Sequence, residues 1–189
     1  MRRLKLIMLT AVVIALAFLI IDGIPFKSAD AAVSLNRRVY SYLEAESNRE
    51  KVFKTAIELN NKSSSNACVY FLSEALRRNG VNVPKGTGNT SQIISVLQEK
   101  GFSKNTDYRD LQPGDIVFTT DEKGNKEGVP SHAYVFMKWV KEGGYDYAYI
   151  CDNQAKDYDN QIYHIRNIKN KDTVKGITKD AFSFFMRPE

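Results

Sequence analysis

The spacing of apolar residues changes near residue 101, and this change constrains the fold more than any other feature of the sequence. In residues 33–60, 67–79 and 90–100, apolar side chains recur every three to four positions, as in amphipathic helices. The polar stretch 46–50 is expected to divide the first helix into two. Because such helices precede a series of strand patterns, the sequence predicts an α+β domain with N-terminal helices packed on an antiparallel sheet.

Polar residues and glycines indicate where these helices begin and end. Ser34 or Asn36 could cap the first helix, and Thr90 or Ser91 the last. Asn79-Gly80 is a typical helix stop.

The strand patterns are short runs of β-branched and aromatic residues. They are "LQPGDIVFTT" (111–120), "SHAYVFMKWV" (131–140), "YDYAYICDNQ" (145–154), "QIYHIRNI" (161–168) and "AFSFFMRP" (181–188). The second run is apolar on both faces, which predicts a central strand. We find no internal repeat and no linker after the N-terminal region.

The N-terminus resembles a secretory signal peptide. A basic start is followed by the almost purely apolar run Leu6–Ile21, and Ala29-Asp30-Ala31 has the form of a signal-peptidase site. An uncleaved membrane anchor is the alternative, although the apolar run is shorter than the roughly 20 residues of a typical transmembrane helix. Residues 1–31 are therefore expected to direct the chain out of the cell, to the cell envelope or the medium. Residues 32–189 would then form one domain that is not embedded in the membrane.

Charge and composition exclude some classes of function. The net charge of +5 at pH 7 is small, and no cluster of lysines and arginines interleaves with aromatic residues, so nucleic-acid binding is not predicted. A mild positive charge suits an anionic cell wall. The chain has two cysteines and two histidines, with no Cys-x-x-Cys motif or Cys/His cluster, so neither a metal nor another cofactor is expected.

Cys68 is the first candidate for chemistry, because it follows small polar residues and opens the helix at 67–79. Free N–H groups at a helix N-terminus can lower the pKa of a thiol and stabilise an oxyanion beside it. The alternatives are a buried core cysteine and one half of a disulfide with Cys151.

A cysteine nucleophile needs a base, and His132 is the candidate because it begins a strand directly after a loop. His164 lies within "QIYHIRNI" and is expected to be an exposed or cross-strand residue. Strand alternation places Asp152 on one face and Asn153 on the other, so only one of them can orient His132. Asp152 is preferred because a carboxylate holds an imidazolium best, and Asn153 remains the alternative.

The order of these elements resembles the NlpC-type and CHAP-type papain-like cell-wall hydrolases. The resemblance spans roughly residues 49–187, of which "LQPGDIVF" is the most specific part. It rests on "NACVYFLSEALRRNGVNVP" (66–84), "TSQIISVLQEKGF" (90–102), "LQPGDIVF" (111–118), "SHAYVFM" (131–137) and "YICDNQ" (149–154).

The resemblance implies a papain-like fold that hydrolyses amide bonds in peptidoglycan stem peptides, as an endopeptidase or an N-acetylmuramoyl-L-alanine amidase. It implies Cys68 as nucleophile, His132 as base and Asp152 as the third residue, while Asn66 could donate to the oxyanion. Ala67 stands where these families usually carry a polar residue. The alternative function is a catalytically silent domain of the same fold that binds wall fragments or a protein partner.

Overall fold

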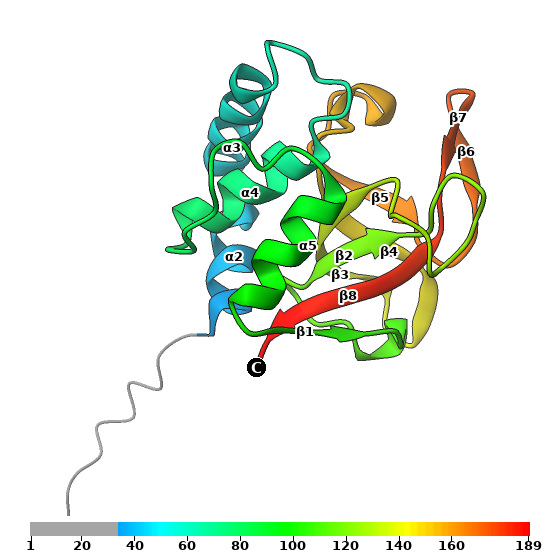
Figure 1. The fold of residues 1–189 in the computed structure, drawn as a ribbon. Coiled ribbons are helices and arrows are strands. Elements are labelled where there is room, and N and C mark those ends of the chain that lie inside the picture. Colours follow the sequence, from blue (N-terminus) through cyan, green and yellow to red (C-terminus); the bar gives the residue numbers. More distant parts are fainter. Residues whose placement is uncertain (1–33) are drawn as a thin grey trace, which may run out of the picture. The chain divides into compact units, whose positions relative to one another are not determined.

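The computed structural model describes residues 34–189, in which four helices are followed by strands (Figure 1). The helices are α2 (Leu35–Glu44), α3 (Glu46–Leu59), α4 (Cys68–Arg78) and α5 (Thr90–Glu99). The strands are β1 (Phe102–Asn105), β2 (Ile116–Thr119), β3 (Ala133–Lys141), β4 (Gly144–Cys151), β5 (Tyr163–Asn167), β6 (Asp172–Val174), β7 (Ile177–Lys179) and β8 (Phe182–Pro188). Two 3-10 turns, η1 (Tyr108–Asp110) and η2 (Ala155–Tyr158), complete these elements.

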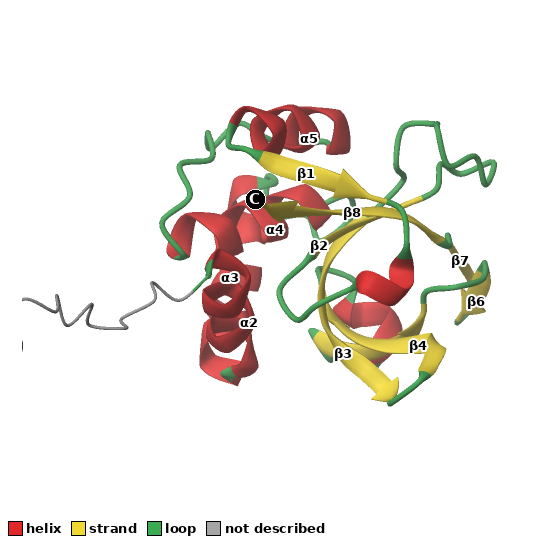
Figure 2. Ribbon diagram, turned by 90° about the horizontal axis from the view of Figure 1, so that it is seen from below, coloured by secondary structure: helices red, strands yellow, loops and turns green. Residues whose placement is uncertain are grey.

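Six of the strands form one antiparallel sheet in the order β1-β8-β2-β3-β4-β5. Strands β6 and β7 form a separate hairpin. Figure 2 shows that the main sheet is strongly curved and that helices α2 to α5 lie on one side of it. The predicted α+β class, with helices packed on an antiparallel sheet, is therefore confirmed, and β3 is a central strand as expected.

Both faces of the sheet are buried. The helices cover one face, where their apolar side chains meet alternate residues of the strands. The members of this core include Val39, Leu43, Val52, Ala56, Val69, Leu72, Leu76, Ile93, Leu97, Ile116, Phe118, Ala133, Val135, Met137, Cys151, Phe184 and Met186. The intervening strand residues form a second cluster on the opposite face, with Val117, Tyr134, Phe136, Ala148, Ile150, Phe182 and Phe185. Burial of both faces explains why β3 lacks polar alternation.

The helix boundaries agree with the sequence patterns except at one cap. The first two helices separate at Ala45, next to the predicted break, and Ser34 caps α2 by accepting from the Arg37 N–H. The cap of α5 is Asn89, not Thr90 or Ser91 as expected. Asn89 and Gln92 form a capping box, which satisfies backbone donors that a cap one residue later would leave open.

The turn in "LQPGDIVF" fixes helix α2 to the sheet. Gly114 has φ +91°, and a Cβ at this position would lie 2.0 Å from the carbonyl oxygen of Asn36. Glycine is therefore required both for the left-handed backbone conformation and for lack of space. The buried carboxylate of Asp115 accepts from the Gln112 N–H at 2.7 Å, from the Asn36 amide, and from the Arg187 guanidinium at 2.6 and 2.8 Å. Asp115 thus joins the backbone of the turn to α2 and β8.

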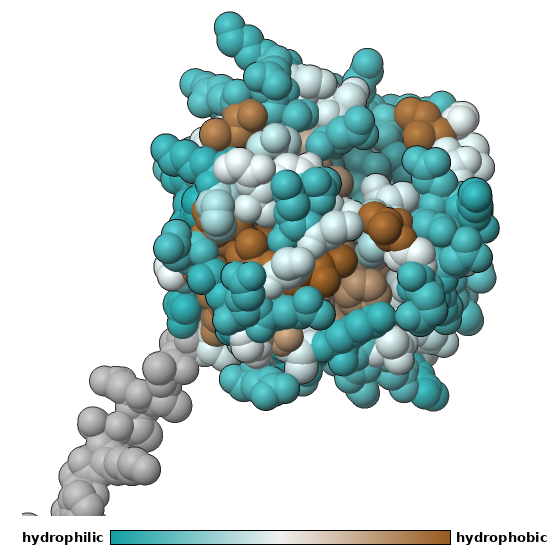
Figure 3. Space-filling model, in the orientation of Figure 1, coloured by the Kyte–Doolittle hydropathy of each residue, from teal (hydrophilic) through white to brown (hydrophobic). Residues whose placement is uncertain are grey.

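The predicted signal peptide lies outside the described residues. Within residues 34–189, none of the helices has the length and apolar character needed to cross a membrane. The face of this unit seen in Figure 3 is mainly hydrophilic, with small separate hydrophobic areas.

Candidate active site

Cys68 is the first residue of α4 and lies against the start of strand β3. Ala67 is the N-cap residue of α4, and its methyl side chain cannot accept a hydrogen bond from the first N–H groups of the helix. Asn66 has φ +55°, a left-handed conformation that asparagine tolerates and that turns the chain sharply into the helix. Cys68 is nearly buried, with 9% of its surface exposed.

His132 directly precedes β3, and hydrogen bonds to β2 and α5 fix its backbone and the loop before it. Its backbone N–H donates to the Thr119 hydroxyl at 3.0 Å, and its carbonyl accepts from the Thr119 N–H at 3.1 Å. The Thr90 hydroxyl, at the start of α5, donates to the Pro130 carbonyl at 2.8 Å. The loop that ends at His132 is thereby bound to both the sheet and the helix layer.

Cys68, His132 and Asp152 lie in series, with the His132 ring between the thiol and the carboxylate. The His132 Nε2 lies 2.7 Å from Oδ2 of Asp152, and the His132 ring is close enough to the Cys68 thiol to lower the pKa of that thiol. A carboxylate can only accept, so Nε2 carries a proton and Nδ1 is left to face the sulfur. The structure therefore brings together the three residues that the sequence proposed for nucleophile, base and orienting group.

Asp152 is fully buried and its carboxylate is held at both oxygens. Oδ1 accepts the Gln154 N–H at 2.7 Å, while Oδ2 faces His132. Burial raises the pKa of Asp152. The positive charge of His164 when that ring is protonated, the bond and charge of His132, and the charge of Arg166 lower the pKa more. The pKa thus lies well below its usual range, and the side chain stays ionised.

The pKa values of Cys68 and His132 move toward each other. Burial raises the pKa of Cys68, but the hydrogen bond and charge of His132 and the backbone N–H of Ala133 outweigh burial and leave the pKa below its ordinary value. Burial lowers the pKa of His132, but the bonds to Asp152 and Cys68 and their charges leave it above its ordinary value. These opposite shifts favour a thiolate–imidazolium pair.

Asn153, the alternative third residue, faces a different partner. Its side-chain amide donates to the Ser64 carbonyl at 2.9 Å, in the loop that leads to Cys68. The strand-alternation argument is consistent with this arrangement, because Asp152 and Asn153 turn to different sides. Asn153 therefore contacts the loop before the nucleophile rather than the ring of His132.

His164 contributes a second imidazole to this site, which the sequence reading did not assign to it. The expectation of an exposed ring is wrong, since only 5% of His164 is exposed; the cross-strand position is correct, because it pairs with Ile150 of β4. Its Nε2 lies 3.8 Å from Oδ1 of Asp152. The contact depends on the pairing of β5 with β4, which buries His164 and Arg166 together and which the sequence alone does not give.

Cys151 is the last residue of β4 and belongs to the core beneath the helices. Both cysteines are free, so the structure contains no Cys68–Cys151 disulfide. Burial raises the pKa of Cys151 well above its ordinary value.

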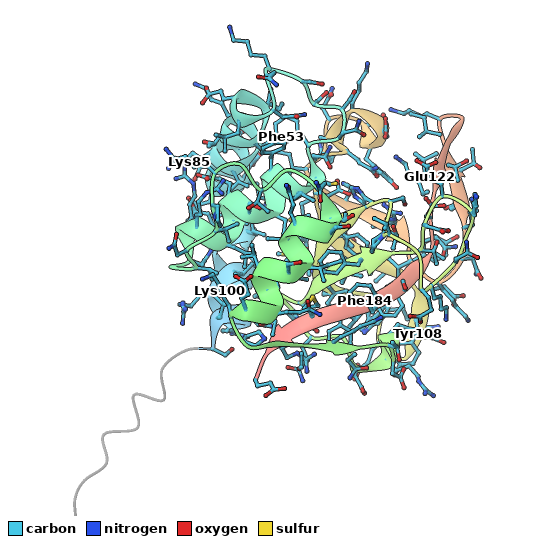
Figure 4. The ribbon with its side chains drawn as sticks, in the orientation of Figure 1. Phe53, Lys85, Lys100, Tyr108, Glu122 and Phe184 are labelled. Atoms are coloured by element: carbon cyan, nitrogen blue, oxygen red, sulfur yellow. The ribbon has the colours of Figure 1, made fainter. Side chains whose placement is uncertain are left out.

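A cleft of about 490 Å³ opens beside His132. Its walls come from the loop before α4, the β2–β3 loop, strand β5 and the β6–β7 hairpin; Figure 4 labels Glu122, which lies next to that hairpin. The lining residues are Asn66, Glu122, Ser131, His132, Gln154, Arg166, Lys171, Ile177, Thr178, Lys179 and Asp180. The lining is mostly polar and carries both signs of charge, which suits a hydrogen-bonding substrate such as a peptide.

Comparison of the chain with protein-family models, curated proteins and solved structures found no match. Within residues 34–189, no group of three or more histidine, cysteine, aspartate or glutamate side chains could hold a metal ion.

Proposed function

We propose that this protein is an exported cysteine hydrolase that cleaves amide bonds in peptidoglycan stem peptides, as an endopeptidase or an N-acetylmuramoyl-L-alanine amidase. The observation that carries the proposal is that the His132 ring lies between the Cys68 thiol and the Asp152 carboxylate, beside a polar cleft. Export rests on the signal-like N-terminus. The order of a cysteine at a helix start, a histidine at a strand start and an acidic residue after the next strand supports a papain-like domain of NlpC or CHAP type.

The first half of the reaction uses the thiolate of Cys68 as nucleophile. The sulfur attacks the amide carbonyl carbon, a C–S bond forms, and the carbonyl oxygen becomes an oxyanion. The backbone N–H of Cys68 at the start of α4 and the side chain of Asn66 in the cleft are the candidate donors to this oxyanion. His132 then gives its Nδ1 proton to the leaving nitrogen as the C–N bond breaks, and a thioester remains.

The second half regenerates the enzyme. Neutral His132 takes a proton from water, and the resulting hydroxide attacks the thioester carbonyl. The C–S bond breaks, the carboxylic acid product leaves, and the proton on His132 restores the imidazolium beside the thiolate. Asp152 holds the Nε2–H of His132 throughout, which keeps Nδ1 directed at the sulfur and stabilises each imidazolium.

The test is the release of soluble fragments from purified peptidoglycan by the full chain and by Cys68→Ala. Wild type should release fragments, and the variant should lose this activity by about 10³-fold or more, because no other residue supplies the nucleophile. Mass spectrometry of the fragments distinguishes a cut within the stem peptide from a cut at its attachment to the sugar. Failure of wild type to release fragments, or equal release by the variant, would contradict the proposal.

One observation favours a second candidate, a catalytically silent domain that binds wall fragments or a protein partner. His132 and Asn66 line the cleft, whereas the nearly buried Cys68 is not among the lining residues. A silent domain would cosediment with peptidoglycan equally well as wild type and as Cys68→Ala, without releasing fragments from it.

A further inference from the structure

His164 lies on the far side of Asp152 from His132. It extends from β5, is almost fully buried, and stacks on Tyr158 of η2 with ring centroids 3.6 Å apart and planes inclined by 14°. Asp152 thus stands between two imidazoles, with Oδ2 toward His132 and Oδ1 toward His164. Because the chain contains only these two histidines, both of its imidazoles meet at one carboxylate.

The hydrogen bonds of His164 determine which nitrogen can titrate. Its Nδ1 lies 2.9 Å from the Gln161 carbonyl oxygen, which can only accept, so Nδ1 carries a proton in both charge states. The titrating atom is therefore Nε2. This atom is buried, has no hydrogen-bond partner, and lies 3.8 Å from Oδ1 of Asp152. A proton gained or lost by His164 changes the charge directly beside the carboxylate that holds His132.

The charged groups around His164 oppose one another. Burial lowers the pKa of His164, as do the positive charges of Arg166 on the same strand and His132 at the start of β3; the charge of Asp152 and the Gln161 carbonyl raise it. The net pKa is below the ordinary value for histidine. Tyr158 packs on the ring, and the Lys179 ammonium lies 5.5 Å from the centroid of Tyr158. The ring is accordingly neutral near pH 7.

We propose that His164 is a positioning residue of the Cys68–His132–Asp152 series and sets the acid limit of its reactivity. With Nε2 unprotonated, the whole negative charge of Asp152 supports the His132 imidazolium. With Nε2 protonated, His164 forms a second ion pair with Oδ1, and Asp152 then stabilises the positive charge of His132 less. The proposal rests on the proposed roles of Cys68 and His132.

The direction of the effect follows from the order of the charges. A positive charge on His164 is separated from His132 by Asp152 alone, whereas the sulfur of Cys68 lies beyond the His132 ring. The new charge therefore disfavours the imidazolium more than it favours the thiolate. The proton moves from His132 back to the sulfur, and the neutral thiol is a poor nucleophile. Protonation of His164 thus reduces the reactivity of Cys68 even while the Cys68–His132 pair keeps a single proton.

The test measures the rate of Cys68 alkylation by iodoacetamide against pH, on the full chain, with mass spectrometry to separate the two cysteines. The alkylation rate of wild type should fall steeply on the acid side of its pH profile. In His164→Gln this fall should occur at a pH lower by about 0.5–1 unit, as expected when one neighbouring charge is removed. Tyr158→Phe keeps the stacked ring and should follow wild type. Acid limbs that coincide for wild type and His164→Gln would overturn the proposal.

A second measurement covers the case in which His164→Gln fails to fold. Nitrogen NMR of histidine-labelled wild type should show that the Nε2 of one ring titrates while its Nδ1 stays protonated, and that the other ring responds in the same step. Titration at Nδ1, or no response of the second ring, would overturn the proposal. Neither measurement needs a substrate, so a chain that cleaves no peptidoglycan would contradict the proposed function and still test the role of His164.

Discussion

The N-terminus of α4 and the C-terminus of β4 each place a free cysteine in the same hydrophobic cluster, yet the pKa values of the two thiols are shifted in opposite directions. Cys68 meets the ring of His132 and the backbone N–H of Ala133, which together lower its pKa. Cys151 is fully buried and has no comparable donor, and burial raises its pKa despite the charge of Arg49. The difference shows that neighbouring donors, together with access to the sulfur, decide which thiol in this protein can react.

The largest expected effect is the difference in alkylation rate between the two thiols. At pH 6.5, iodoacetamide should modify Cys68 faster than Cys151 by on the order of 10³-fold or more, because Cys151 has almost no thiolate and no access to the reagent. Peptide mass spectrometry of the folded chain gives both rates in one sample. In denaturant the two rates should become similar. Comparable rates in the folded chain would remove the distinction between the two regions.

The second prediction concerns the orienting carboxylate. Asp152→Asn should reduce hydrolysis by about 10²–10³-fold, because an amide does not stabilise the His132 imidazolium and can favour the wrong tautomer. The alkylation rate of Cys68 at pH 6.5 should also fall, while the alkylation rate of Cys151 stays unchanged. Kinetics on a soluble muropeptide, with alkylation in parallel, measures both effects. Full activity in Asp152→Asn would show that Cys68 owes its reactivity to the helix terminus alone.

The parts of the fold that the sequence predicts are those with a clear local signal. Helices and core strands have a strong hydrophobic period, and the Gly114 turn has a distinctive composition. Strand β1, "FSKN", and the hairpin strands β6, "DTV", and β7, "ITK", are short and largely polar, so their pairing depends on the strands or turns beside them. Sequence patterns did not identify them for this reason.

In the candidate site, too, some residues have a local sequence signal and others do not. Cys68, His132 and Asp152 stand at the ends of strongly patterned elements, and the resemblance of the order of those elements to papain-like hydrolases predicted that the three residues meet. The contact of His164 with Asp152 depends on the register of β5 against β4, and the bond from Asn153 to Ser64 joins positions 89 residues apart. A single sequence does not give such registers and loop paths.

The third prediction addresses how the loop before α4 delivers Cys68. Asn153→Ala removes the bond to the Ser64 carbonyl and should slow Cys68 alkylation and hydrolysis by roughly 3–10-fold, since one partly buried hydrogen bond contributes about 1 kcal/mol. Gln161→Ala, which alters an exposed side chain, is the matched control and should behave as wild type. A loss as large as that of Asp152→Asn would mean that Asn153 takes part in orienting His132.

The smallest effect is expected from Cys151, and it appears in stability rather than in activity. Cys151→Ala should leave hydrolysis unchanged and lower the free energy of unfolding at pH 7 by about 1 kcal/mol, through lost packing in the core. The pH dependence gives the sharper result. The folded state keeps Cys151 as a thiol above the pKa of the unfolded thiol, so wild type retains its full stability below about pH 9 and loses it as the pH rises further.

Cys151→Ala lacks this alkaline loss. Between pH 9 and pH 10 the wild type should lose about 1 kcal/mol relative to the variant, close to the 1.36 kcal/mol that one pH unit represents, and urea unfolding at each pH measures the difference. Cys68 cannot produce this signature, because its pKa is shifted in the opposite direction. Parallel stability curves for wild type and Cys151→Ala would mean that Cys151 ionises as readily in the folded chain as in the unfolded one. The contrast between the two thiols would then rest on Cys68 alone.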